Sequence, residues 1–94
     1  MITGSQRITA ERANQLQQGY SIEKDRKHQD GEMVGIAMHL ARREKDYVET
    51  SVPVWASKLI DGLREKHRCD RIQLLAIAGA FIAAEIDRLQ RSER

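Results

Sequence analysis

The most regular hydrophobic pattern in the chain lies near its C-terminus and predicts one long helix over about Arg71–Arg91. Asp70, just before this helix, has a side chain suited to an N-cap. Two apolar stripes follow the helical period: the first comprises Ile72, Leu75, Gly79, Ile82, Ile86 and Leu89, and the second comprises Leu74, Ile77, Ala78 and Phe81. A helix that is apolar on nearly all sides is surrounded by neighbours. Because so short a chain has few neighbours to offer, we expect part of this helix to contact a second subunit.

Shorter helices are predicted before it. The first spans about Ala10–Gln18, with Thr9 as its N-cap and Gly19 at its C-terminal end. Its apolar positions, Ala13 and Leu16, are few, so we expect it to lie on the surface of a larger unit.

Two more helices are predicted between residues 30 and 67. One spans about Gly31–Lys45 after an N-cap at Asp30, and its apolar residues recur at spacings of three and four. They are Met33, Ile36, Ala37, Leu40 and Ala41. The other begins at Pro53, whose fixed φ suits the first helical position, and ends near His67. Its apolar side consists of Trp55, Leu59, Ile60 and Leu63.

These elements predict an all-α fold, a bundle of three to four helices in a single domain of residues 1–94. We expect residues 1–8 to form a flexible N-terminus and residues 19–31 to form an ordered loop, with a helical turn after Ser21 as an option. A ridge of small residues on the last helix (Ala76, Ala80 and Ala84 beside Gly79) permits a close helix crossing. We also expect the bundle to be completed by dimerisation, as a homo-oligomer formed through the 71–91 helix.

The charge is spread evenly along the chain, which argues against nucleic acid as a partner. Lys and Arg number 16 and Asp and Glu number 14, giving a net charge of +2. There is no basic cluster of the kind that duplex-binding proteins show. Four aromatic side chains are also too few for a base-stacking platform.

Cysteine content and hydropathy exclude further classes. The single cysteine, Cys69, excludes a disulfide framework within the chain and a zinc site made only of cysteines. The longest uncharged run, Ile72–Ala84, is too short to span a bilayer, and the first residues lack the apolar stretch of a signal peptide. We therefore expect a cytoplasmic protein with no membrane partner.

Polar side chains that could form a site gather in three places. These are Arg12 with Gln15, Asp25 with His28 and Glu32, and Asp70 with Gln73. If the loop turned helically, the three residues of the second group would face one way, and carboxylate–imidazole–carboxylate is an acceptable ligand set for a divalent ion. The alternative is a solvated loop in which Glu32 complements the helix dipole.

A fourth group is basic and lies around the start of the last helix. It consists of Arg64, Lys66, Arg68 and Arg71, together with His67. The free N–H groups of a helix N-terminus attract phosphate, so this group could bind one. The alternative is a solvated turn, because two nearby carboxylates dilute the positive charge. Cys69 lies beside His67, but no oxyanion-hole signature accompanies the pair, so we expect no reactive thiol.

Several strings of residues are distinctive when taken together. The first half contains Glu11-Arg12-x-x-Gln15, then Gly19-Tyr20-Ser21, then Asp25-x-x-His28-x-x-Gly31-Glu32-Met33. The second half contains Asp70-Arg-Ile-Gln73-Leu-Leu-Ala-Ile-Ala, then Ile82-Ala-Ala-Glu85-Ile86-Asp87-Arg88-Leu89. These strings resemble small phage and prophage proteins of largely unassigned role. Those proteins in turn look like distant relatives of the MazG-like, all-α nucleoside triphosphate pyrophosphohydrolases. The resemblance covers about residues 10–45 and 68–91.

The resemblance implies a MazG-like bundle whose metal site is lost. The enzymes bind Mg²⁺ through an E-x-x-E motif on one helix and an E-x-x-D motif on a later one, and the ion positions the triphosphate for hydrolysis. Glu32 matches the family, but Met33 and Ile36 stand in place of the E-x-x-E carboxylates, and Asp70 and Gln73 in place of the second pair. A thioether or an alkyl group does not ligate Mg²⁺. The resemblance therefore implies no catalytic residue and no bound cofactor.

Three functions are compatible with these residues, and we favour the first. It is a non-enzymatic, phage-type binding protein for a nucleotide-type ligand or a host protein, in the cytoplasm of the host cell. Its candidate ligand-binding residues are Arg12, Gln15, Asp25, His28, Glu32, Arg68, Asp70, Arg71 and Gln73. The second is a divergent Mg-dependent pyrophosphohydrolase whose ion is held by Asp25, Glu32 and Asp70, with His28 in support. The third is an oligomerisation or adaptor module without a small-molecule ligand.

Overall fold

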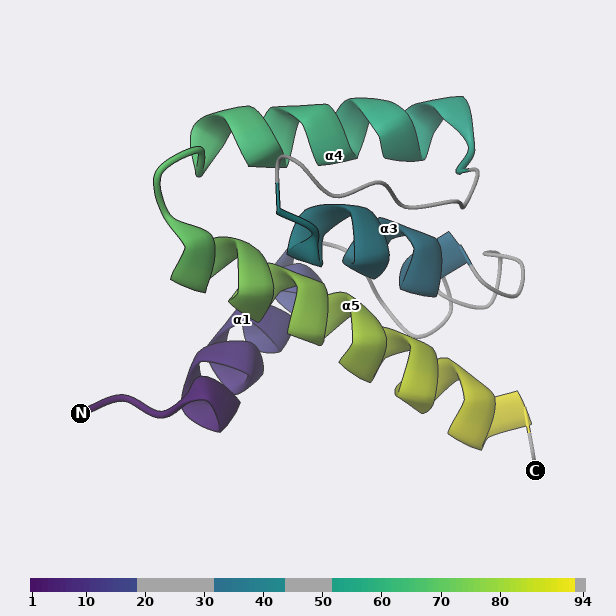
Figure 1. Cartoon of the computed structure of the whole chain (residues 1–94). Coiled ribbons are helices and arrows are strands. Elements are labelled where there is room, and N and C mark those ends of the chain that lie inside the picture. Colours follow the sequence, from purple (N-terminus) through teal and green to yellow (C-terminus); the bar gives the residue numbers. More distant parts are fainter. Residues whose placement is uncertain (19–31, 44–51, 93–94) are drawn as a thin grey trace.

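Four helices make up most of the part of the chain that the structure, a computed structural model, describes: residues 1–18, 32–43 and 52–92. They are α1 (Gly4–Gln17), α3 (Glu32–Ala41), α4 (Val54–Lys66) and α5 (Arg71–Ser92). Because these residues contain no strand, the predicted all-α bundle is confirmed. In Figure 1, α5 runs across the molecule, α3 lies between α5 and α4, and α1 passes behind α5.

The hydrophobic core forms where α3 packs against α4 on one side and α5 on the other. It consists of Met33, Ile36, Ala37 and Leu40 from α3, Ala56 and Ile60 from α4, and Leu74, Ile77, Ala78, Phe81 and Ala84 from α5. The period-3.6 stripe predicted for the second of the shorter helices is therefore the buried side of α3. Burial of this stripe is the main stabilising term for a helix of only 10 residues.

The two predicted stripes of α5 have different surroundings. The second stripe is buried against α3. The five large residues of the first stripe, Ile72, Leu75, Ile82, Ile86 and Leu89, remain 43–58% exposed. The chain's own helices therefore cover only part of the apolar surface of α5. The predicted N-cap is confirmed, since Asp70 Oδ1 accepts a hydrogen bond from the Gln73 backbone N–H at 3.0 Å.

Helix α1 begins at Gly4, so the predicted start near Ala10 and the predicted N-cap at Thr9 are wrong. The N-cap is Thr3, whose hydroxyl accepts from the Gln6 N–H at 3.2 Å while the Gln6 side chain accepts from the Thr3 N–H at 2.9 Å. This reciprocal pair is a capping box. Thr9 lies inside the helix and donates to the Ser5 carbonyl. Residues 4–8, expected to belong to a flexible N-terminus, form the first turns of α1.

Helix α1 crosses α5 at Gly79, where the small-residue ridge permits a close approach. A Cβ atom at Gly79 would lie 2.6 Å from Cδ1 and 2.7 Å from Cγ1 of Ile8. Ala76 and Ala80, on the same part of α5, are 4% and 0% exposed. The predicted close crossing is thus made within the chain, between α5 and α1.

The buried positions of α1 are polar. Arg12 and Gln15 are 8% and 7% exposed, whereas Ala13 and Leu16, its predicted apolar positions, are exposed. The reason is the orientation that Ile8 and the α5 crossing impose on α1. Arg12 and Gln15 follow Ile8 by four and seven positions and so lie on the same side of the helix.

Helix α3 ends at Ala41, before the predicted end at Lys45. Two arginine side chains donate hydrogen bonds to the backbone carbonyls at this end. Arg64 Nη1 donates to the carbonyls of His39 at 2.9 Å and Arg42 at 3.1 Å, and Arg71 Nη1 donates to Arg42 at 3.0 Å. Cations stabilise the negative end of a helix dipole, so these side chains from α4 and α5 fix the carboxyl end of α3.

Helix α4 follows its prediction closely. Pro53 occupies the N-cap position instead of the first helical position, and the predicted end is confirmed, since His67 is the C-cap. Trp55, predicted on the apolar side, is 41% exposed, while the neighbouring Ala56 is completely buried. The buried stripe of α4 therefore runs through Ala56 and Ile60. The loop predicted over 19–31, with its turn after Ser21 and the N-cap at Asp30, lies outside the described residues.

Candidate functional site

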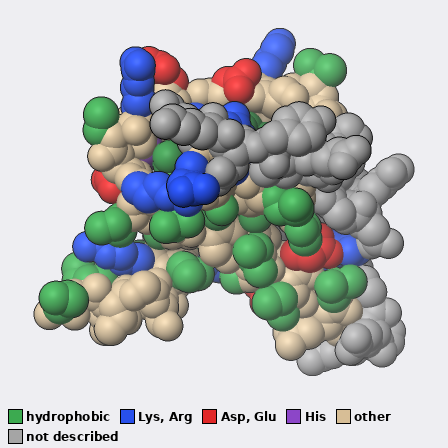
Figure 2. Space-filling model, viewed as in Figure 1, with side chains coloured by type: hydrophobic (Ala, Val, Ile, Leu, Met, Phe, Trp, Pro, Cys, Tyr) green, Lys and Arg blue, Asp and Glu red, His purple; other side chains and the backbone are tan. Residues whose placement is uncertain are grey.

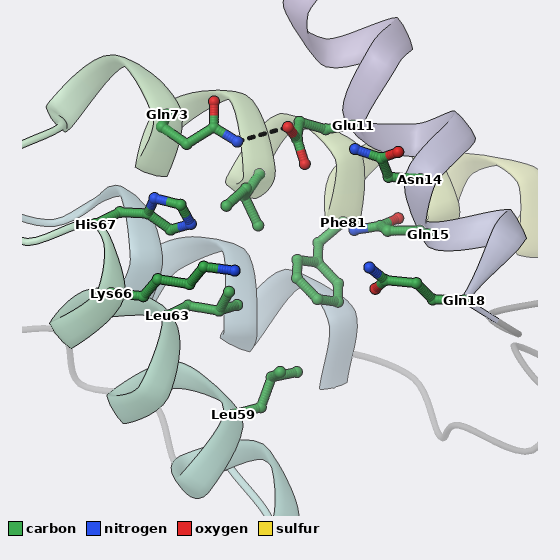
Figure 3. A pocket seen from close by; sticks show the side chains of 11 residues that line it. Glu11, Asn14, Gln15, Gln18, Leu59, Leu63, Lys66, His67, Gln73 and Phe81 are labelled. Atoms are coloured by element: carbon green, nitrogen blue, oxygen red, sulfur yellow. Dashed lines mark hydrogen bonds between the residues drawn. The ribbon is translucent and has the colours of Figure 1, made fainter.

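A pocket lies between α1 and α4, with α5 as its floor (Figure 3). Its volume is about 200 Å³. The lining residues are Glu11, Asn14, Gln15 and Gln18 from α1, Leu59, Leu63 and Lys66 from α4, His67 after α4, and Gln73, Ile77 and Phe81 from α5. The pocket therefore has a polar wall on α1 and an apolar part on α4 and α5.

The polar wall follows from the spacing of residues on α1. Glu11, Asn14, Gln15 and Gln18 are separated by three, four and seven positions, which places them on one face of a helix. In Figure 3 all four side chains extend from α1 toward the pocket. Their amide and carboxylate groups supply both hydrogen-bond donors and acceptors.

One hydrogen bond joins the polar wall to the floor. Gln73 Nε2 donates to Glu11 Oε1 at 2.5 Å, and Figure 3 shows this bond at one end of the pocket. Gln73 is itself placed by the N-cap at Asp70, which fixes the first turn of α5. Glu11 is half-buried and its second oxygen, Oε2, accepts no hydrogen bond from any described residue.

The Gln15 side chain is buried and has an unused donor. Its Oε1 accepts from Arg12 Nη1 at 3.2 Å, while its Nε2 has no partner among the described residues. The amide cannot turn over, because Nε2 would then face the guanidinium donor. Arg12 is held in turn by Asp87, with Nε and Nη2 at 3.3 Å and 3.2 Å from Oδ2.

An unpartnered buried amide is costly and therefore informative. Leaving a buried donor unsatisfied costs about 1–3 kcal/mol, and most such groups in proteins are paired. Arg12 fixes the Gln15 amide so that Nε2 is the atom left without a protein partner, and Gln15 lines the pocket. A carbonyl or ring-nitrogen acceptor that reached this atom from the pocket would satisfy it.

The opposite part of the pocket is apolar, with two cationic or ionisable side chains beside it. Phe81 is 3% exposed, and Leu59 and Leu63 are half-buried. Lys66 is exposed and His67 is half-buried, and both lie at the α4 end of the pocket. A flat ring would pack on the apolar part, and an anionic substituent outside the pocket would meet Lys66.

The predicted site residues are only partly brought together. Gln15 and Gln73 line the pocket, and Arg12 supports Gln15 from behind. Asp70 caps α5, Arg71 bonds the end of α3, and Arg68 is exposed; none of these three lines the pocket. Asp25 and His28 lie outside the described residues, and for Glu32 only the backbone, at the start of α3, is described.

The pocket also contains residues whose pattern in the sequence did not predict them as ligands. These are Asn14, Gln18, Leu59, Leu63, Ile77 and Phe81, with Glu11 considered only as part of a string. One signal was available, since four polar residues share one face of α1 next to few apolar ones. The α4 residues gave no such signal, because an apolar stripe indicates core as readily as a pocket wall.

Met33 and Ile36, the residues that the predicted resemblance aligns with metal-binding carboxylates, do not fit Mg²⁺. Met33 and Ile36 are 1% and 0% exposed and belong to the hydrophobic core of α3. Within the described residues, no group of three or more His, Cys, Asp or Glu side chains could hold a metal ion. In the same residues no helix is long and apolar enough to cross a membrane.

Comparison of the chain with protein-family models, curated proteins and solved structures finds no match. The resemblance to phage proteins and to the MazG-like superfamily therefore stays a prediction from the residues quoted above.

Proposed function

We propose that this protein is a non-catalytic binding protein whose α1–α4–α5 pocket takes the base of a nucleotide-type ligand. The observation that carries the proposal is the buried Gln15 amide, whose Nε2 lacks a partner and which lines the pocket. The core position of Met33 and Ile36 supports the absence of catalysis, since these residues match the carboxylates that hold Mg²⁺ in the enzymes it resembles.

The size of the pocket supports a single ring system. Pockets for drug-sized ligands measure about 300–1,000 Å³, and this one measures about 200 Å³. A nucleobase fits such a volume, while its sugar and phosphates would extend outward. Lys66 is exposed beside the pocket and has the charge to meet a phosphate there.

The hydrogen-bonding groups of α1 favour particular bases. Gln15 Nε2 is a buried donor without a protein partner, and Glu11 Oε2 is a partly exposed acceptor that bonds no described residue. A base edge with a carbonyl next to a ring N–H supplies a partner for each. Guanine, hypoxanthine, uracil and thymine have this edge, whereas adenine and cytosine place an exocyclic amine where the carbonyl would be.

The test is a binding screen by thermal shift and calorimetry, using nucleosides and nucleoside monophosphates of all six bases named above. We expect guanosine, inosine or uridine compounds to raise the melting temperature, and adenosine and cytidine compounds to do so much less. Binding of all the compounds alike, or of none, would contradict the proposal.

The matched variants are Gln15→Met and Gln17→Met, the same change at neighbouring positions of α1. Gln15→Met keeps the side-chain length but removes the donor, together with the oxygen that accepts from Arg12. We expect about tenfold weaker binding, the equivalent of one hydrogen bond to the ligand. Gln17 is exposed and does not line the pocket, so Gln17→Met should bind as the parent does. Equal binding by both variants would place the ligand elsewhere.

A further inference from the structure

The outer face of α5, defined by Ile72, Leu75, Gly79, Ile82, Ile86 and Leu89, carries no charged residue over five turns. Figure 2 shows hydrophobic side chains along the course of α5, from the left of the view to its lower right. The large residues of this face are each 43–58% exposed. In a chain with 32% charged residues, a surface helix normally directs such residues to water. The outer face is therefore built to be covered.

The spacing on the outer face fits another helix of the same kind. Its residues are separated by three, four, three, four and three positions, which is the a/d pattern of a two-stranded coiled coil. Together the exposed side chains present roughly 400 Å² of apolar surface, in the range of the interaction patches of monomers. A standard interface takes about 800 Å² from each partner, so the face and its flanks suit a small two-chain interface.

We propose that a second copy of this chain covers the outer face, with its α5 packed antiparallel to the first. An antiparallel pair is symmetric about the middle of the face, so the same surface serves both chains. Ile72 then faces Leu89 of the other copy, and Leu75 faces its Ile86.

A hollow at the N-terminal end of the face favours the antiparallel direction. Gly4, Arg7 and Ile8 of α1 and Ile72, Leu75 and Ala76 of α5 line this hollow, whose volume is about 200 Å³. The C-terminal end carries two projecting side chains, Ile86 and Leu89, which are 50% and 47% exposed. Only the antiparallel direction places these two side chains of one copy at the hollow of the other.

The first experiment is sedimentation velocity of the full chain over a range of concentrations. We expect a two-chain species that dissociates on dilution. Ile82→Glu and Ile86→Glu should each weaken association about tenfold or more, because they place a charge in the apolar interface. Val54→Glu is the control, since Val54 is an apolar residue on α4 that is 74% exposed. Far-UV circular dichroism checks that helix content is kept.

The direction is tested by disulfide trapping in a Cys69→Ser background, which removes the single cysteine. Ile72→Cys and Leu89→Cys are prepared as separate proteins. We expect covalent dimers when the two are mixed and oxidised, and little crosslinking of either alone. Efficient crosslinking of Ile72→Cys alone would overturn the antiparallel direction. A single-chain mass at every concentration, or equal association of Ile82→Glu and Val54→Glu, would overturn the interface.

Discussion

The contact between Ile8 and Gly79 predicts that the same glycine-to-alanine change has opposite effects in two backgrounds. Alanine is favoured over glycine within a helix by about 1 kcal/mol. At Gly79, however, the added Cβ would lie 2.6 Å from Ile8 Cδ1, well inside the 3.5–4.0 Å of an ordinary carbon contact. Because Ile8 Cγ1 is also only 2.7 Å away, rotation of the terminal methyl group alone does not relieve the overlap.

The magnitude follows from setting these two effects against each other. Overpacking of this kind costs about 1–3 kcal/mol, so Gly79→Ala should be neutral or destabilise the fold by up to about 2 kcal/mol. In an Ile8→Ala background the colliding atoms are gone, and Gly79→Ala should then stabilise the protein by about 1 kcal/mol. The interaction free energy of this double-mutant cycle is therefore about 1–3 kcal/mol.

The assay is urea unfolding followed by circular dichroism, with the free energy of unfolding extrapolated to water. Gly62→Ala is the control, because nothing lies within 4 Å of a Cβ at that position of α4. It should stabilise the protein by about 1 kcal/mol with either residue at position 8. Measurement at several protein concentrations separates any change in self-association from the stability of the fold. If Gly79→Ala stabilised the parent as much as Gly62→Ala does, the close crossing of α1 and α5 would be refuted.

Two further predictions concern helix ends. Thr3→Ala should destabilise the protein by about 1 kcal/mol through loss of the capping box. Thr9→Ala, inside the helix, is the control and should change the free energy of unfolding by less than about half as much. Equal losses in urea unfolding would contradict the assigned start of α1. Arg64→Met keeps most of the packing volume but removes the donors to the carboxyl end of α3, and it should lower the free energy of unfolding by about 1–3 kcal/mol. Lys58→Met, at an exposed position of α4, is the control and should have little effect. A Tm unchanged by Arg64→Met would show that this end of α3 does not depend on the guanidinium.

The sequence predicts α5, the buried stripe of α3 and the end of α4 well because their signals are local. A long period-3.6 pattern, an N-cap at Asp70 and a buried stripe through Met33 and Ile36 depend on neighbours a few positions away. The start of α1 also had a local signal, the Thr3-x-x-Gln6 capping box. The residues that follow have too weak an apolar pattern for the predicted helix to be extended back to Thr3.

The candidate site is less predictable because it depends on distant partners. Arg12 is buried through Asp87, which lies 75 positions away, and Glu11 bonds Gln73 across 62 positions. No local pattern indicates that Arg12 and Gln15, instead of Ala13 and Leu16, lie on the buried side of α1. The pocket further requires the placement of α4 opposite α1, which no residue of either helix specifies alone.

The arginine contacts at the carboxyl end of α3 have a consequence for the order in which the chain becomes stable. At 10 residues, α3 is shorter than the roughly 12–15 residues that an isolated helix needs in water. The donors that fix its end come from α4 and α5, both later in the sequence. During synthesis, α3 therefore gains its full stability only after residue 71 has been made. In the finished protein, its backbone amides should open to hydrogen exchange together with the core, as one cooperative unit with α4 and α5.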